Sequence, residues 1–121
     1  MSLPPTFMIV EDDADIREAV CELLHAQGFA TLSAENGQDA LVLLRKQPDV
    51  RAIVLDVTMP VMNGATFRGE QLADPSIAAI PLILLTGRED SAPIARALGA
   101  AACVQKPFAP NDLLRVLADY R

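Results

Sequence analysis

Apolar residues are concentrated in short runs, and four of these runs have the length of a β-strand. Each run is too continuous for a half-exposed strand, which indicates strands that are buried on both faces of a sheet. A fifth, shorter run lies between the turn signals Gln27-Gly28 and Glu35-Asn36-Gly37 and predicts an edge strand. The predicted strands cover residues 7–10, 30–32, 52–55, 81–85 and 101–104.

Between the strands, apolar residues recur at the spacing of a helix with one buried face, most clearly from Ile16 to Leu24. The predicted helices cover 14–25, a segment around 40–44, 64–72, 91–98 and 113–120. Gly99 is expected to end the fourth helix, and Asn111 is expected to be the N-cap of the last. Because strand and helix alternate five times, the sequence predicts a doubly wound α/β fold with a parallel sheet covered on both faces.

Length and composition indicate a single domain. The chain has 121 residues, of which 51% are hydrophobic and 21% are charged, so it can bury a core and is too apolar to be disordered. We expect residues 1–121 to form one domain with no output domain, and residues 1–5 to be disordered or left over from expression. Cys21 and Cys103 lie among apolar neighbours, which predicts reduced core thiols and no disulfide.

Charge and hydropathy disfavour two classes of partner. No apolar run approaches the roughly 20 residues of a membrane span, and the N-terminus lacks the features of a signal peptide, so we expect a cytoplasmic protein without membrane contact. The chain has 10 lysines and arginines against 16 acidic residues, a net charge of −6. This charge disfavours direct binding of nucleic acid by the domain.

Polar residues follow four of the five predicted strands. Glu11-Asp12-Asp13 follows the first strand and Asp56 follows the third. Thr86 follows the fourth strand, and the fifth leads through Gln105 into Lys106. Because the carboxyl ends of parallel strands lie at the same edge of a sheet, we expect these side chains to converge there.

Several carboxylates at one edge require positive charge. At an effective dielectric of about 20, each close pair repels by roughly several kcal/mol, and burial adds a desolvation cost. Mg²⁺ suits a site of one or two carboxylates, waters and an incoming phosphate. Lys106 supplies a second positive charge, and together with the Thr86 hydroxyl and the Asp56 carboxylate it predicts a site that binds a phosphoryl group.

Each of these features also has an ordinary structural explanation. The acidic triplet could cap the helix that follows it, and Asp56 could belong to a turn. Thr86-Gly87 could likewise be a turn, and Lys106-Pro107 a solvated loop. Four such ends at one edge of one sheet, however, favour a functional site over four separate coincidences.

The segments that carry these residues resemble the receiver domain of two-component response regulators, and the likeness extends from about Thr6 to Tyr120. The matching segments are Met8-Ile9-Val10-Glu11-Asp12-Asp13, Ile53 to Gly64 with the phosphorylation segment around Asp56, Leu84-Leu85-Thr86-Gly87, and Val104-Gln105-Lys106-Pro107-Phe108. The resemblance implies a flavodoxin-like (βα)5 fold with strand order 2-1-3-4-5.

The resemblance also implies a phosphoacceptor. Asp56 would attack a phosphoryl group on a histidine of a sensor kinase or histidine phosphotransfer protein, giving an acyl phosphate. Asp12 and Asp56 would bind Mg²⁺ through their side chains and Thr58 through its backbone carbonyl, while Glu11 would act mainly through metal-bound water. Asp13 fits less well as a ligand and would cap the helix.

Further positions acquire roles by the same resemblance. The Thr86 hydroxyl would donate to one phosphoryl oxygen and Lys106 would pair with another, with a cis bond before Pro107 aiming the lysine. The family's slow autodephosphorylation would be tuned at Thr58 and Arg88, with no other enzymatic activity. The aspartyl phosphate would shift a face that binds a downstream protein target or an output domain outside this chain.

Cys103 departs from the family pattern. The family usually carries an aromatic residue three positions before the lysine, and this residue turns inward when the threonine moves. A cysteine is too small to report the state of the site in this way, so we expect altered coupling to the binding face. A redox role would need exposure and a lowered pKa, which a strand position disfavours.

Three other functions fit the sequence less well than a working receiver does. A haloacid-dehalogenase-type phosphatase needs a second aspartate two residues after its nucleophile, where this chain has Thr58. An interaction-only receiver would not need the full set of site residues. A flavin-binding module would need a phosphate loop in place of the acidic triplet, which repels phosphate when no metal is bound.

Overall fold

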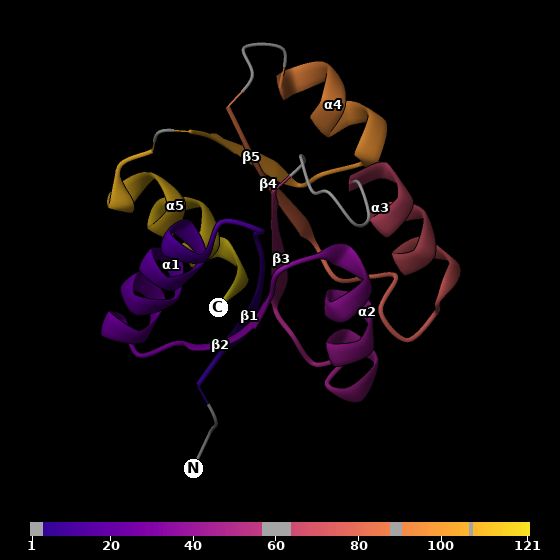
Figure 1. Cartoon of the computed structure of the whole chain (residues 1–121), viewed down its shortest axis with the longest axis horizontal. Helices are drawn as coiled ribbons and strands as arrows, with labels where there is room; N and C mark the ends of the chain where they lie inside the picture. Colours follow the sequence, from indigo (N-terminus) through magenta and orange to yellow (C-terminus); the bar gives the residue numbers. More distant parts are fainter. Residues whose placement is uncertain (1–3, 57–63, 88–90, 107) are drawn as a thin grey trace.

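The computed structural model describes residues 4–56, 64–87, 91–106 and 108–121. Within these residues it has one sheet of five parallel strands in the order β2-β1-β3-β4-β5 (Figure 1). The strands are β1 (Thr6–Val10), β2 (Ala30–Ala34), β3 (Ala52–Asp56), β4 (Leu82–Thr86) and β5 (Ala102–Gln105). The helices are α1 (Ala14–Ala26), α2 (Gly37–Lys46), α3 (Gly64–Ala73), α4 (Ser91–Leu98) and α5 (Pro110–Leu117), followed by the short 3₁₀ helix η1 (Ala118–Tyr120). The predicted fold class and strand order are confirmed.

The two faces of the sheet are covered by different helices. Helices α1 and α5 lie side by side on one face, and α2, α3 and α4 lie on the other (Figure 1). Alternate residues of each strand serve the two cores, since Met8 packs on the α2–α4 side whereas Phe7 and Ile9 pack on the α1–α5 side. All three side chains are fully buried, which explains why the strand reads as a continuous apolar run.

The two predicted stops by glycine have a common geometry. Gly28 and Gly99 have φ values of +84° and +64°, in the left-handed region that favours glycine. After α1, the Phe29 N–H donates to the Leu24 carbonyl and the Gly28 N–H to the His25 carbonyl. The same pair of bonds closes α4 at Gly99, so both helices end in a Schellman motif.

The predicted cap of the last helix is wrong. Helix α5 begins at Pro110 with Ala109 as its N-cap, so Asn111 lies inside the first turn. Proline suits the first helical position, because its missing N–H would have no partner within the helix there. The Asp112 carboxylate then accepts a hydrogen bond of 3.1 Å from the Ala109 N–H, a contact that the residue pattern does not predict.

The edge strand and the start of the chain differ in detail from what the sequence predicts. Strand β2 continues to Ala34, two residues beyond the predicted end, because Ser33 and Ala34 pair with Ile9 and Val10. Residues 1–3 lie outside the described part of the chain, and the Pro5 carbonyl accepts a hydrogen bond from the Ala30 N–H. Among the described helices, none is long and apolar enough to cross a membrane.

Candidate functional site

The sheet brings the four polar strand ends to one edge. Asp56 and Thr86 are the last residues of β3 and β4, and Glu11 directly follows β1. All three are buried, with 4%, 3% and 1% of their surface exposed, respectively. The Lys106 N–H donates to the Thr86 carbonyl at 2.7 Å, which extends the pairing of β5 with β4 and fixes Lys106 beside the same edge.

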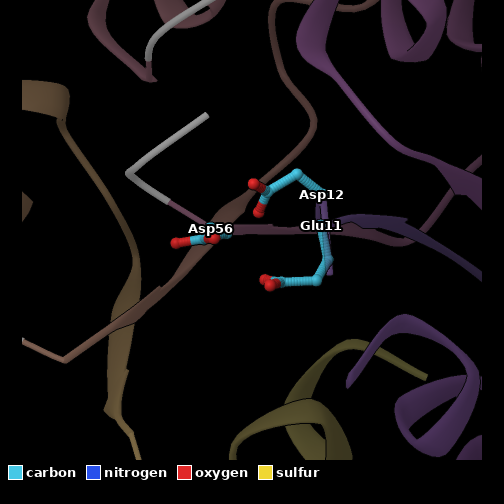
Figure 2. Close-up of side chains that lie close together, drawn as sticks. All are labelled: Glu11, Asp12 and Asp56. Carbon is cyan, nitrogen blue, oxygen red and sulfur yellow. The ribbon is translucent and has the colours of Figure 1, made fainter. Parts of the chain in front are cut away.

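Three acidic side chains converge at this edge, as Figure 2 shows. Glu11, Asp12 and Asp56 each offer one carboxylate oxygen, and these oxygens all lie within 4.8 Å of one another. Asp12 is exposed whereas the other two are buried, so the cluster is open to solvent on the side of Asp12. Carboxylate oxygens in such a group are the ligands that Mg²⁺ and Ca²⁺ prefer.

Among the described residues, Lys106 is the positively charged group in direct contact with the cluster. Its Nζ donates to both carboxylate oxygens of Glu11, at 3.2 and 3.1 Å, and lies 3.5 Å from Asp56 Oδ2. One ammonium is therefore shared between two buried carboxylates. The Lys106 side chain is 22% exposed, whereas the Glu11 and Asp56 side chains that it contacts are 1% and 6% exposed.

The pKa of Glu11 reflects its burial and the neighbouring carboxylate of Asp56. Burial, followed by the nearby charge of Asp56, raises the pKa of the Glu11 carboxyl to about 7. The hydrogen bond and charge of Lys106 oppose this shift without cancelling it. A divalent cation among the three carboxylates would add positive charge that favours their ionised forms.

The backbone that carries Glu11 and Asp12 is held by several hydrogen bonds. Asp13 is the N-cap of α1, and its Oδ1 accepts from the N–H groups of Asp15 and Ile16 at 2.9 and 3.2 Å, as expected for a cap. The Glu11 N–H donates to the Ala34 carbonyl. One further contact is not predicted by the sequence: Arg17 Nη1 donates to the Glu11 carbonyl at 2.8 Å. No short motif signals such a bond from a side chain to the backbone.

Three expected positions lie outside the described residues. Thr58 falls in 57–63 and Arg88 in 88–90, and Pro107, with its expected cis bond, is also outside. Cys103 is described, on β5, where it packs partly buried against the core on the α4 side. Both cysteines are free thiols, as predicted, but each is only partly buried.

A sequence model of the response regulator receiver domain matches residues 7–118. The chain belongs to this family. Receiver domains are the signal-accepting parts of response regulators in two-component systems. Over 112 residues, 90% of this chain and 48% of the relative, the chain is 36% identical to the phosphate regulon transcriptional regulatory protein PhoB of Pseudomonas aeruginosa. The chain spans about half the length of the curated relatives it matches.

Solved receiver structures share the whole fold. Chemotaxis protein CheY4 of Vibrio cholerae superposes with a TM-score of 0.88 at 28% identity, covering 98% of this chain and 99% of CheY4. The receiver domain of sensor histidine kinase PA1611 from Pseudomonas aeruginosa has a TM-score of 0.87 at 23% identity, covering 97% of each chain. The PA1611 structure has a magnesium ion coordinated in its active site cleft. At 23% identity, the similarity to PA1611 shows a shared fold and nothing more.

Proposed function

We propose that this receiver domain accepts a phosphoryl group on Asp56 from the phosphohistidine of a sensor kinase or histidine phosphotransfer protein, in a reaction that depends on Mg²⁺. The observation that carries the proposal is the convergence of three carboxylates within 4.8 Å, with Lys106 as the cation that contacts two of them. An arrangement with more buried negative than positive charge weakens the fold, so a function must account for it.

The residues fit the proposed metal. Glu11, Asp12 and Asp56 supply hard oxygen ligands from three positions, and the exposed side chain of Asp12 leaves the cluster accessible to an ion and its waters. By the family resemblance, the Thr58 carbonyl would complete the set. Bound there, Mg²⁺ would neutralise charge on the carboxylates and on the incoming phosphoryl group.

Side chains of the site position the phosphoryl group for transfer to Asp56. An Asp56 carboxylate oxygen forms a bond to phosphorus while the bond from phosphorus to the histidine nitrogen breaks, which leaves an aspartyl phosphate and a neutral histidine after protonation. Lys106 already lies 3.5 Å from Asp56, so its ammonium can pair with an oxygen of the new phosphate. The Thr86 hydroxyl, at the end of the neighbouring strand, donates to another.

The aspartyl phosphate then changes a surface that a downstream protein recognises. In the family this face comprises α4, β5 and α5, and Cys103 stands where an aromatic residue would turn inward. We propose that coupling here proceeds through the Gly87 loop, with the phosphate lifetime tuned at Thr58 and Arg88. The domain acts in the cytoplasm as a phosphoacceptor regulator, and its only catalysis is its own phosphorylation and slow dephosphorylation. It contacts proteins rather than nucleic acid or membrane.

Intact mass after incubation with acetyl phosphate tests the proposal. We expect the addition of one phosphoryl group in the presence of Mg²⁺, no addition without Mg²⁺, and no addition to the variant Asp56→Asn. The control Asp49→Asn removes an exposed aspartate outside the cluster and should label like the wild type. Undiminished labelling of Asp56→Asn would refute Asp56 as the acceptor. No labelling of a folded wild type, even by a phosphohistidine donor, would support an interaction-only receiver.

A further inference from the structure

The peptide between Glu11 and Asp12 is held at the carbonyl by a side chain of α1. Arg17 lies one turn into the helix, and side chains of a helix point back toward its N-terminus. From there Arg17 Nη1 reaches the Glu11 carbonyl at 2.8 Å, in a partly buried position. On the other side of the same residue, the Glu11 N–H donates to the Ala34 carbonyl at 3.1 Å. Glu11 is thus fixed through both of its peptide groups.

This carbonyl determines where Asp12 lies. A peptide unit is planar, so fixing the Glu11 carbonyl fixes the direction in which the chain enters Asp12. The Asp12 side chain is exposed and has no hydrogen bond or ion pair within the described part of the chain. Its position relative to Glu11 and Asp56 therefore depends on the backbone before and after it. The bonds of the Asp13 cap hold the backbone after it, and Arg17 holds the backbone before it.

We infer that Arg17 is a positioning residue for the acidic cluster, holding the Glu11–Asp12 peptide so that the Asp12 carboxylate is placed to bind a divalent cation. This inference rests on the proposed Mg²⁺ site. Partners that orient the ligands of a metal typically change its affinity by about 10- to 100-fold when they are removed. Arg17 acts on a ligand through the backbone rather than through a second side chain.

Whether the Mg²⁺ affinity rises or falls when Arg17 is replaced distinguishes a positioning role of Arg17 from an effect of its charge. Arg17 carries a positive charge close to a site for a cation, so its electric field alone opposes cation binding. Removing the charge would then strengthen the binding of Mg²⁺. Loss of positioning would weaken it. A weaker affinity in a variant without the arginine therefore cannot come from the field.

Calorimetric titration of Mg²⁺ into the purified chain tests this inference with three variants. Arg17→Met removes the donor and the charge while keeping an unbranched apolar stem, and Arg17→Lys keeps the charge and an N–H donor. Arg45→Met removes an arginine of α2 that is paired with Asp74, away from the cluster. Amide hydrogen exchange without metal provides a second readout, at the Glu11 N–H and at the buried strand β4 for comparison.

For Arg17→Met we expect about tenfold weaker Mg²⁺ binding and faster exchange at Glu11, with exchange in β4 unchanged. Arg17→Lys should recover part of the affinity, and Arg45→Met should bind as the wild type does. Wild-type or tighter Mg²⁺ binding by Arg17→Met would overturn the inference, as would faster exchange throughout β4, which would mean general destabilisation. Failure of the wild type itself to bind Mg²⁺ would refute the proposed function, and this inference with it.

Discussion

Two clusters of buried polar side chains lie at opposite ends of the sheet. At the carboxyl end, Glu11 and Asp56 share one lysine and form hydrogen bonds and ion pairs that leave excess negative charge. At the amino end, Gln71 of α3 is fully buried, and its Nε2 donates to the carbonyls of Ile77 and Ile80 at 2.9 and 3.0 Å, just before β4. Its Oε1 accepts from Arg68 Nη1.

The amino-end cluster of Arg68 and Gln71 stabilises the fold through its hydrogen bonds. Arg68 also donates to the carbonyls of Leu98 and Gly99, at 2.8 and 3.1 Å, so the cluster joins α3 to the end of α4. Burial lowers the pKa of Arg68, and its hydrogen bonds within the described part of the chain go to neutral acceptors, the Gln71 amide oxygen and two backbone carbonyls. A buried polar group with its partners in place rigidifies a fold, whereas one with excess like charge weakens it. The comparison therefore separates a cluster that stabilises the fold from the cluster that we propose as the phosphoacceptor site.

The largest expected effect is the loss of the buried amide in Gln71→Leu. Three hydrogen bonds disappear, and two backbone carbonyls next to β4 lose a buried donor. We expect the free energy of unfolding to fall by about 3 kcal/mol, measured by chemical denaturation. The control Leu72→Ala alters the neighbouring side chain, which is 52% exposed, and should change stability by less than about 0.5 kcal/mol. Equal effects of the two variants would show that the amide network contributes nothing specific.

Arg68→Met should have a smaller effect, because the Gln71 amide keeps its two carbonyl partners. The variant loses the bonds to Leu98 and Gly99 where α4 meets β5, and we expect a destabilisation of about 1–2 kcal/mol. Faster amide exchange should be confined to this junction. Arg96→Met, an exposed arginine on α4, is the control. Uniformly faster exchange across the sheet would contradict a local role for Arg68.

At the carboxyl end we expect the loss of a buried polar group to stabilise the fold instead of weakening it. Asp56→Asn removes one of two buried charges that repel each other, while Lys106 keeps both bonds to Glu11. We expect the metal-free variant to be more stable than the wild type by about 1 kcal/mol. Mg²⁺ should then stabilise the wild type more than the variant, because binding to the folded state adds to stability. A metal-free Asp56→Asn less stable than the wild type would mean that the ion pair with Lys106 outweighs the repulsion.

The sequence predicts the carboxyl-end cluster better than the amino-end one. The acidic residues follow apolar runs directly, and parallel strands bring their ends together, so topology alone places Glu11 and Asp56 at one edge. Gln71 gives no such signal, because a glutamine in a helix is usually exposed and its burial depends on the loop before β4.

Contacts from side chain to backbone account for most of what could not be predicted. The bond from Arg17 to the Glu11 carbonyl depends on the angle between β1 and α1, and the hydrophobic pattern does not fix that angle. The extension of β2 to Ala34 similarly comes from pairing with β1 rather than from the residues of β2. Asn111 was a reasonable cap by residue type, but Pro110 set the start of the helix.

The smallest effect on stability is expected for a substitution of Asp74. This residue contacts Arg45 at 2.9 Å and accepts hydrogen bonds from Ser76. These bonds, the Ser76 hydroxyl first, hold the pKa of Asp74 below its ordinary value. A lowered pKa in the folded state contributes stability above the ordinary pKa of about 3.9, and this contribution is lost as the pH falls through the folded value. Asp74→Asn should therefore lower the melting temperature slightly at pH 7, by less than any variant at the amino-end cluster. The difference should vanish in strong acid, and a difference that grew on acidification would contradict this assignment.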